Sequence, residues 1–225
     1  MSTITLRQFE SVASLNESVA ALLKHHIEQE YPFDHAVMLS GGNTPLEAYR
    51  LLAAQKCVVS GNLRLFLSDE RLVPASSPAS NYGNLLPLVE SLRMNKDRFM
   101  RVRSELGPEQ AAGQYDVDIR KFINGGGRIA LGLLGLGKDG HTASLFRRED
   151  LERGKGRYAI ASVAPDGVER VSVTPDLLSK IRQVIFVVSG QDKREMVEKF
   201  AAYPMQVTAG AAVAGVKSKQ IWFAL

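Results

Sequence analysis

Residues 135–146, GLGKDGHTASLF, hold the side chains in this sequence that are best suited to acid–base chemistry. Asp139 and His141 lie two positions apart, and glycines at positions 135, 137 and 140 frame them. An imidazole titrates near neutral pH and is the usual general base, and a neighbouring carboxylate fixes its tautomer. We therefore expect this segment to present His141 as a base, with Asp139 as a candidate partner.

The same glycines spell G-x-G-x-x-G, the fingerprint of a dinucleotide-binding turn. That interpretation requires a place in the first strand–helix unit and an acidic residue about 20 positions further on. The segment instead lies past the middle of the chain, and the next acidic cluster, Glu149, Asp150 and Glu152, follows too soon. We therefore expect no nicotinamide cofactor.

Metal and covalent chemistry have equally little support in the sequence. Histidines with H-x-x-x-H or H-E-x-x-H spacing are absent, and the single cysteine, Cys57, allows neither an internal disulfide nor a paired-cysteine metal site. No G-x-S-x-G elbow is present to expose a nucleophilic serine. The expected chemistry therefore uses no cofactor and no metal.

The segment Ser40-Gly-Gly-Asn-Thr-Pro45 joins an apolar run to a helical pattern. Its glycines let backbone N–H groups approach a ligand, and the helix start adds unpaired donors and a partial positive charge. The segment lacks the lysine of a Walker loop, so a simple phosphate monoester fits it better than ATP. An ordinary strand–helix turn is the alternative interpretation.

Charged residues follow the next apolar run directly, in Ser68-Asp-Glu-Arg71, and Ser80-Asn81 comes shortly after. Carboxylates at such a place are costly unless they are paired or functional. Asp69 and Arg71 can point into one cleft, where Arg71 would bind a phosphate or a developing oxyanion in fork geometry. A salt bridge that only holds the loop is the alternative.

Apolar runs and helical patterns alternate along the chain, which predicts an α/β fold. We expect a mostly parallel, Rossmann-like three-layer sheet covered by helices on both faces, with a small antiparallel α/β lobe near residues 158–174.

Thr44 is the expected N-cap of a helix at 44–55, and Ser14-x-x-Glu17 is the expected capping box of a first helix at 14–30. The expected strands are 35–40, 62–68, 128–135, 158–163, 169–174, 183–189 and 219–224, and the other expected helices are 80–92, 107–123 and 191–202. Ligands of open parallel sheets bind beyond the carboxyl ends of the strands. The segments 40–45, 68–81 and 135–146 each follow an expected strand, so we expect these three loops to converge on one site.

Composition places the chain among ordinary globular proteins. Its 225 residues are 45% hydrophobic and 23% charged, which suits one domain spanning residues 1–225. The net charge of +4 suits a small anionic ligand, or a mildly basic surface without a role, and no dense basic tract indicates nucleic acid. No apolar run reaches membrane-spanning length, and no signal peptide is evident, so we expect a cytoplasmic protein. Composition does not fix the oligomeric state; our expectation is a monomer.

The segments SGGNTP, DERLVP…SNYGNL and GLGKDGHTASLF, in this order, resemble the signature segments of the 6-phosphogluconolactonase family. ERVSVT at 169–174 and SGQDK at 189–193 are also similar to that family, so the resemblance runs from about residue 36 to about residue 200. Asn43 stands where the family usually has serine, Arg147 where it usually has proline, and the C-terminal segment lacks the family's common ending.

The resemblance implies hydrolysis of 6-phospho-D-glucono-1,5-lactone to 6-phospho-D-gluconate, in the oxidative pentose phosphate pathway, with this small sugar phosphate lactone as the partner. His141 would take a proton from the attacking water, and Asp139 or Asp69 would orient His141 or the water. Arg71 and loop amides would stabilise the oxyanion, unless Arg71 serves the phosphate instead. The residues expected to bind the substrate and its phosphate are Ser40, Gly41, Gly42, Asn43, Thr44, Asn81, Gly137, Lys138, Arg170 and Lys193.

Two other functions are compatible with the same loops. Glucosamine-6-phosphate deaminase, of the same fold family, resembles this sequence in all three loops but carries a catalytic glutamate five residues past the histidine, where this chain has Phe146. A sugar-phosphate sensor of this fold usually carries a DNA-binding helical module, and only about 35 residues precede the first expected strand. Lactone hydrolysis is therefore the favoured hypothesis.

Overall fold

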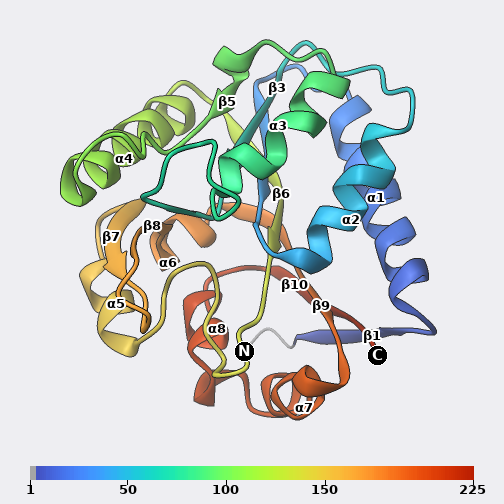
Figure 1. The fold of residues 1–225 in the computed structure, drawn as a ribbon, viewed down its shortest axis with the longest axis vertical. Coiled ribbons are helices and arrows are strands. Elements are labelled where there is room, and N and C mark those ends of the chain that lie inside the picture. The colour runs from blue at the N-terminus through green and yellow to red at the C-terminus, as the bar shows by residue number, and fades with distance from the viewer. Residues whose placement is uncertain (1–3) are drawn as a thin grey trace.

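The computed structural model describes residues 4–225, and a mixed α/β architecture is evident in it (Figure 1). Within these residues the main sheet has seven strands in the order β1-β10-β9-β6-β2-β3-β5, and all neighbouring strands are parallel. The strands are β1 Thr5–Phe9, β2 His35–Leu39, β3 Leu63–Leu67, β5 Phe99–Met100, β6 Arg128–Leu134, β9 Ile181–Ser189 and β10 Ser218–Ala224. The predicted parallel sheet is confirmed.

Helices cover both faces of this sheet, which confirms the predicted three-layer arrangement. The longer helices are α1 Val12–Glu28, α2 Asn43–Ala53, α3 Asn81–Ser91, α4 Pro108–Asn124 and α7 Arg194–Ala202. Side chains alternate along β2, so that Val37 and Leu39 pack with α1, α2 and α3, whereas Ala36 and Met38 belong to the apolar core on the α4 side. A run of uniformly apolar strand residues is therefore explained by burial on both faces.

A small antiparallel sheet lies beside α4 and forms the predicted extra lobe (Figure 1). Its strands, in the described part of the chain, are β4 Asp69–Arg71, β7 Ala159–Val163 and β8 Glu169–Val173, in the order β4-β8-β7. Tyr115 and Ile119 of α4 share an apolar core with Val171 of β8. The sequence did not predict β4, because three consecutive charged residues carry no strand pattern; β4 forms because β8 lies alongside it.

Two predicted helix caps are wrong. The N-cap of α1 is Ser11, whose hydroxyl accepts from the Ser14 N–H and closes a capping box with Ser14, so that Glu17 has no part in it. The N-cap of α2 is Gly42, with φ of +100°, rather than Thr44. Glycine adopts this backbone conformation without strain, so the chain turns into the helix two residues earlier than a threonine cap allows. The Thr44 hydroxyl instead hydrogen-bonds the Ser189 hydroxyl at 2.7 Å.

The last strand, β10, lies inside the main sheet between β1 and β9, although its sequence departs from the family pattern. The sequence did not predict β1 or the short helices α5 Arg148–Arg153, α6 Pro175–Leu178 and α8 Thr208–Ala212, since elements this short carry too few residues for a periodic pattern. The remaining segments are the 3-10 turns Lys96–Arg98, Gln191–Lys193 and Pro204–Gln206. Among residues 4–225, no helix combines the length and apolar character that crossing a membrane requires.

Candidate active site

The strand order reverses direction between β2 and β6, at the centre of the main sheet. From β2 the chain continues to β3 on one side, and from β6 it continues to β9 on the other. The loops after such neighbouring strands separate and leave a crevice at the carboxyl ends, which is the usual ligand site of open α/β sheets. A cleft of about 240 Å³ lies there, and its lining residues are Ser40, Gly41, Gly42, Ser68, Asp69, Arg71, Asn81, Gly135, Leu136, Gly137, His141, Thr142, Ala143, Arg170 and Lys193.

The loop after β2 forms one wall of this cleft with backbone rather than side chains. The Tyr49 hydroxyl holds Ser40 by donating to its carbonyl at 2.9 Å. Gly41 passes so close to Asn81 that a Cβ at position 41 would lie 1.9 Å from Asn81 Oδ1. Asn43 and Thr44 do not line the cleft; they open α2, whose first N–H groups have no acceptor within the helix and can meet an anion.

The loop after β3 carries Asp69 and Arg71 into the cleft, as predicted. Asp69 is buried, and its carboxylate accepts from the hydroxyls of Ser68 at 2.9 Å and Ser144 at 2.8 Å. Arg71 donates from one Nη to the Ala79 carbonyl at 2.6 Å, and its Nε is buried with no hydrogen-bond partner in the described chain. Asp69 is therefore fixed by two hydroxyls, while Arg71 retains donor capacity toward the cleft.

Glu70, between these two residues, points to the opposite side and does not line the cleft. Its buried carboxylate accepts N–H groups from Asn81 at 2.8 Å and Tyr82 at 2.6 Å, at the start of α3. Burial raises the pKa of Glu70, and these backbone hydrogen bonds oppose the rise. The carboxylate thus anchors the α3 N-terminus, where Asn81 Nδ2 donates to the Asp69 carbonyl at 2.9 Å.

The loop after β6 positions the predicted acid–base pair. Nδ1 of His141 lies 2.6 Å from Asp139 Oδ1, and the backbone N–H of His141 donates to the same oxygen at 3.2 Å. A carboxylate only accepts, so the imidazole proton lies on Nδ1 and the lone pair lies on Nε2. Within residues 4–225, Nε2 has no hydrogen-bond partner, and His141 lines the cleft.

The protonation state of Asp139 follows from the same contacts. Burial by itself would raise the pKa of Asp139, but hydrogen bonds from the His141 side chain and backbone outweigh burial and lower it. Asp139 therefore stays ionised at neutral pH and holds the ring in one tautomer. Gly137 makes this geometry possible, because a Cβ at position 137 would lie 2.2 Å from His141 Nδ1.

Phe146 packs against the ring of His141. Its ring centroid lies 4.7 Å from that of His141, and the Arg170 guanidinium carbon lies 5.8 Å from the Phe146 ring. Phe146 thus contacts both the imidazole and a cation of the cleft. The sequence placed Phe146 only as the residue that replaces a carboxylate, and its packing role was missed.

Arg170 and Lys193 add positive charge to the cleft. Arg170 of β8 lies opposite Arg71 of β4 in the small sheet, and burial followed by the charge of Arg71 lowers the pKa of Arg170. Lys193 Nζ donates to the Leu136 carbonyl at 2.8 Å, and burial lowers its pKa as well. Arg170 keeps one acidic partner, Asp166, at 3.7 Å, and partly dehydrated cations of this kind are suited to an anionic ligand.

Lys138 lies apart from these cations. Its Nζ forms an ion pair with Asp192 at 2.8 Å, its side chain is 68% exposed, and it does not line the cleft. A substrate contact of Lys138 stays a prediction. The sequence also missed Ser144, Thr142 and Ala143; Ser144 belongs to the quoted motif, but only the fold shows that its hydroxyl meets Asp69.

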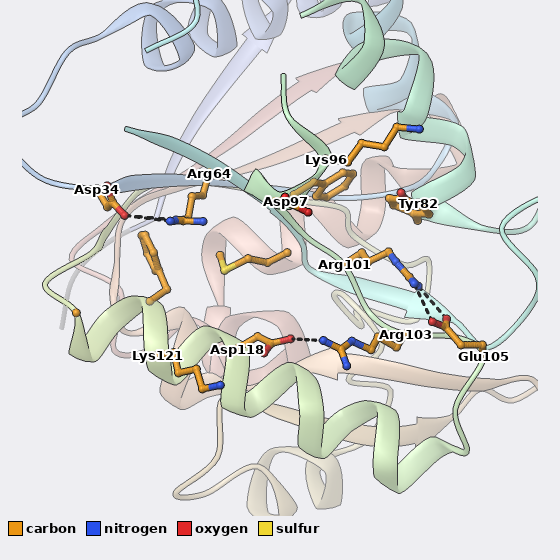
Figure 2. Close-up of a pocket in the computed structure, with 14 residues that line it drawn as sticks. Asp34, Arg64, Tyr82, Lys96, Asp97, Arg101, Arg103, Glu105, Asp118 and Lys121 are labelled. Carbon is orange, nitrogen blue, oxygen red and sulfur yellow. Dashed lines mark hydrogen bonds and ion pairs between the residues drawn. The ribbon is translucent and has the colours of Figure 1, made fainter. Parts of the chain in front are cut away.

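A larger hollow, of about 820 Å³, lies between α4 and the edge of the main sheet, away from all predicted site residues (Figure 2). Ion pairs cross its surface, including Arg64 with Asp34 at 3.4 Å and Arg101 with Glu105 at 2.7 Å. Its charges largely compensate one another, and no histidine lines it. The acid–base pair and the cations with free donors are gathered in the smaller cleft instead.

Comparison with known proteins finds relatives along nearly the whole chain. The family model for glucosamine-6-phosphate isomerases/6-phosphogluconolactonase matches residues 7–222. A 6-phosphogluconolactonase of Treponema pallidum is 36% identical over 173 residues, which are 74% of this chain and 72% of that protein. One of Thermotoga maritima is 33% identical over 192 residues, or 83% and 82% of the two chains. A crystal structure of 6-phosphogluconolactonase from Thermotoga maritima is similar with a TM-score of 0.81 at 28% identity and covers 99% of both chains.

Proposed function

The chain belongs to the glucosamine-6-phosphate isomerase/6-phosphogluconolactonase family, and on that premise we propose that it hydrolyses 6-phospho-D-glucono-1,5-lactone to 6-phospho-D-gluconate. The observation that carries this proposal is the Asp139–His141 pair, with a free Nε2, in one cleft with Arg71, Arg170 and Lys193. A lactone is a cyclic ester, and its hydrolysis needs an activated water and stabilisation of one developing negative charge.

The proton follows a closed path in this mechanism. Nε2 of His141 takes a proton from a water whose oxygen attacks the C1 carbonyl, and a tetrahedral oxyanion forms. When the ring C–O bond breaks, the imidazolium returns its proton to the departing ring oxygen, which becomes a hydroxyl group. Asp139 remains a carboxylate throughout, because its low pKa favours the charged form that stabilises the imidazolium.

The positive groups divide between the two negative ends of the substrate. We assign Arg71, whose Nε is buried without a partner, to the oxyanion at C1. We assign Arg170, Lys193 and the first N–H groups of α2 to the 6-phosphate, since a dianion stabilises the charged forms of two cations that burial leaves partly dehydrated. Asp69, held by Ser68 and Ser144, orients the attacking water from the floor of the cleft.

The deaminase alternative lacks its acid in this cleft. Position 146, where that enzyme carries its catalytic glutamate, holds a phenylalanine whose ring lies on His141. A phenyl ring neither donates nor accepts the protons that an aldose–ketose isomerisation moves. The geometry therefore supports hydrolysis over isomerisation.

The decisive experiment measures both reactions on the purified protein with a chelator present. Freshly prepared 6-phosphogluconolactone is followed by acid release against its spontaneous hydrolysis, and glucosamine-6-phosphate is followed by ammonia release. We expect accelerated lactone hydrolysis without ammonia. Ammonia release would mean that another acid replaces the missing glutamate. The absence of both activities, together with thermal stabilisation by sugar phosphates, would favour a binding protein without turnover.

A further inference from the structure

A second cavity, of about 300 Å³, lies at the amino ends of the strands of the main sheet. The candidate active site lies at the carboxyl ends of the same sheet. Its wall includes the amino-terminal residues of the neighbouring strands β2, β6 and β9, among them His35, Arg128 and Arg182. The loop before β2 adds Tyr31 and Phe33, and the apolar remainder comes from Ile123, Ile129 and Ala130. This volume is at the lower end of the range, about 300–1,000 Å³, that small-molecule sites occupy.

The cations of this cavity have no acidic partners. Arg128, Lys180 and Arg182 all line it, and within residues 4–225 none of the three forms an ion pair or a side-chain hydrogen bond. Of the two acids that flank the cavity loop, Asp34 is already bound to Arg64 at 3.4 Å, and Glu30 accepts a hydrogen bond from the Ser60 hydroxyl at 3.1 Å. By contrast, the cations of the larger hollow in Figure 2 mostly face carboxylates. The positive charge of this cavity is therefore less compensated than that of the larger hollow.

One of these cations is held in place without a counter-ion. The Arg128 guanidinium lies 4.3 Å from the centroid of the Phe33 ring, and Phe33 in turn stacks on Tyr31 with ring centroids 5.3 Å apart. Stacking uses the flat face of the guanidinium and leaves its N–H groups in the plane free to donate. The aromatic pair thus fixes Arg128 as a preorganised donor beside an apolar wall.

His35 supplies an independent observation at the same cavity. It is fully buried, and its Nε2 lies 3.2 Å from the His26 carbonyl, so that Nε2 carries the proton. Its Nδ1 is buried with no hydrogen-bond partner among the described residues. Burial lowers the pKa of His35, so the ring is neutral at pH 7 and its Nδ1 is a buried, unused acceptor next to the cavity.

We propose that this cavity is a binding site for a nucleoside monophosphate, separate from the active site. The doubly charged phosphate matches three unpaired cations better than a singly charged carboxylate does, and arginine forks suit its oxygens. A flat base fits the aromatic and aliphatic wall and the exposed guanidinium face. The proposal does not depend on what the active site hydrolyses.

Calorimetric titration of the full-length protein with AMP tests the site, with adenosine and inorganic phosphate as separate probes. We expect AMP to bind, and each fragment to bind at least about tenfold more weakly, because neither spans both the wall and the cations. Arg128→Gln and Arg182→Gln should each weaken AMP binding about tenfold or more. Arg50→Gln, which removes an exposed arginine of α2, should leave it unchanged.

Arg170→Gln separates this cavity from the active-site cleft, which also attracts phosphate esters. AMP affinity that survives Arg170→Gln but falls in Arg128→Gln supports the proposal. The opposite pattern places AMP in the active-site cleft and overturns it. Equal affinity for phosphate and AMP, or no heat of binding up to millimolar AMP, overturns it as well.

Discussion

At the scale of single residues, the structure assigns each neighbour of His141 a different task. Asp139 sets the tautomer through Nδ1, Gly137 leaves room for the ring, and Phe146 covers its face. Because Nε2 is the nitrogen left free, the proposed mechanism assigns the role of base to this atom. Substitutions at these positions should therefore affect turnover more than folding.

Replacement of the base is the first test at this scale. His141→Ala should lower kcat by about 10² to 10⁴, the usual contribution of a general base. Asp139→Asn should lower kcat less, by roughly 10- to 100-fold, because it removes a charge-assisted hydrogen bond of about 1.5–3 kcal/mol but leaves the imidazole. Steady-state kinetics measure both effects. His25→Ala, an exposed histidine of α1, is the control; a folded His141→Ala enzyme with unchanged kcat would remove His141 from the mechanism.

Phe146 is a positioning residue, and its effect should appear in kcat rather than KM. Phe146→Leu keeps an apolar group but loses the ring contact with His141, a contact worth about 0.5–1.5 kcal/mol, so kcat should fall roughly 2- to 10-fold. Phe146→Tyr retains the ring and should restore most of kcat. An increase in KM at constant kcat would show that Phe146 acts through Arg170 and the phosphate instead.

At the scale of elements, the turn from β2 into α2 fits closely against α3. A Cβ at Gly41 would lie 1.9 Å from Asn81 Oδ1, so Gly41→Ala should displace Asn81 and distort the cleft. We expect kcat/KM to fall about tenfold or more, and overpacking of about 1–3 kcal/mol to lower Tm by roughly 2–10 °C. Gly61→Ala, where nothing lies within 4 Å of the new Cβ, should change neither quantity. Equal behaviour of the two variants in kinetics and calorimetry would contradict this account.

The C-terminal end of α1 should make folding stability depend on pH. Burial, together with the nearby charges of His25, His35 and Arg182, lowers the pKa of His26 from 6.5 to about 4. Between these pH values the unfolded chain binds a proton that the folded chain does not bind, so stability is full above pH 6.5 and falls as the pH drops toward 4. The loss should reach about 2–3 kcal/mol after allowance for the partly exposed ring.

Urea unfolding of the wild type and His26→Gln between pH 7.5 and 4 measures this contribution. In His26→Gln, the free energy of unfolding should lose most of its dependence on pH between 6.5 and 4. His25→Gln, at an exposed position of the same helix, should keep that dependence. Parallel pH profiles of the wild type and His26→Gln would assign the acid sensitivity to other groups.

At the scale of the whole molecule, the cleft lies between two sheets, and both contribute residues to it. The main sheet brings Gly41 and His141 from β2 and β6, and the small antiparallel sheet brings Arg71 and Arg170 from β4 and β8. β4 follows β3 with only Ser68 between them, so the two sheets are connected directly at Asp69. This connection places the positive groups of the small sheet in the same cleft as His141.

The exposed surface predicts a monomer. In the described chain, the large hydrophobic side chains that are exposed belong to separate elements, as Val58, Val117, Val163 and Tyr203 illustrate, and they do not form one sheet or helix face. Stable homodimers usually bury a continuous apolar patch. Sedimentation equilibrium should give a mass near 24.6 kDa at micromolar concentration. A mass of twice that value would show that the chain forms a dimer through a polar interface.

The sequence by itself determined the elements that have a strong local signal. Buried strands such as 128–135 and the amphipathic helix at 107–123 are predicted correctly to within about two residues, because apolar periodicity is a property of the chain alone. The parallel sheet, the antiparallel excursion and the proximity of Asp139 to His141 follow from the same local information. The carboxyl-end rule then brings Gly41, Asp69 and His141 to one edge.

Only the tertiary structure decided which groups touch across elements. It paired Asp69 with Ser144, separated Lys138 from the cleft, moved the α2 cap from Thr44 to Gly42, and made a strand of Asp69–Arg71. These outcomes depend on contacts between segments far apart in the chain, such as β4 with β8, and local patterns carry no information about them. Periodicity determines what a segment becomes, whereas packing against distant segments determines what its side chains do.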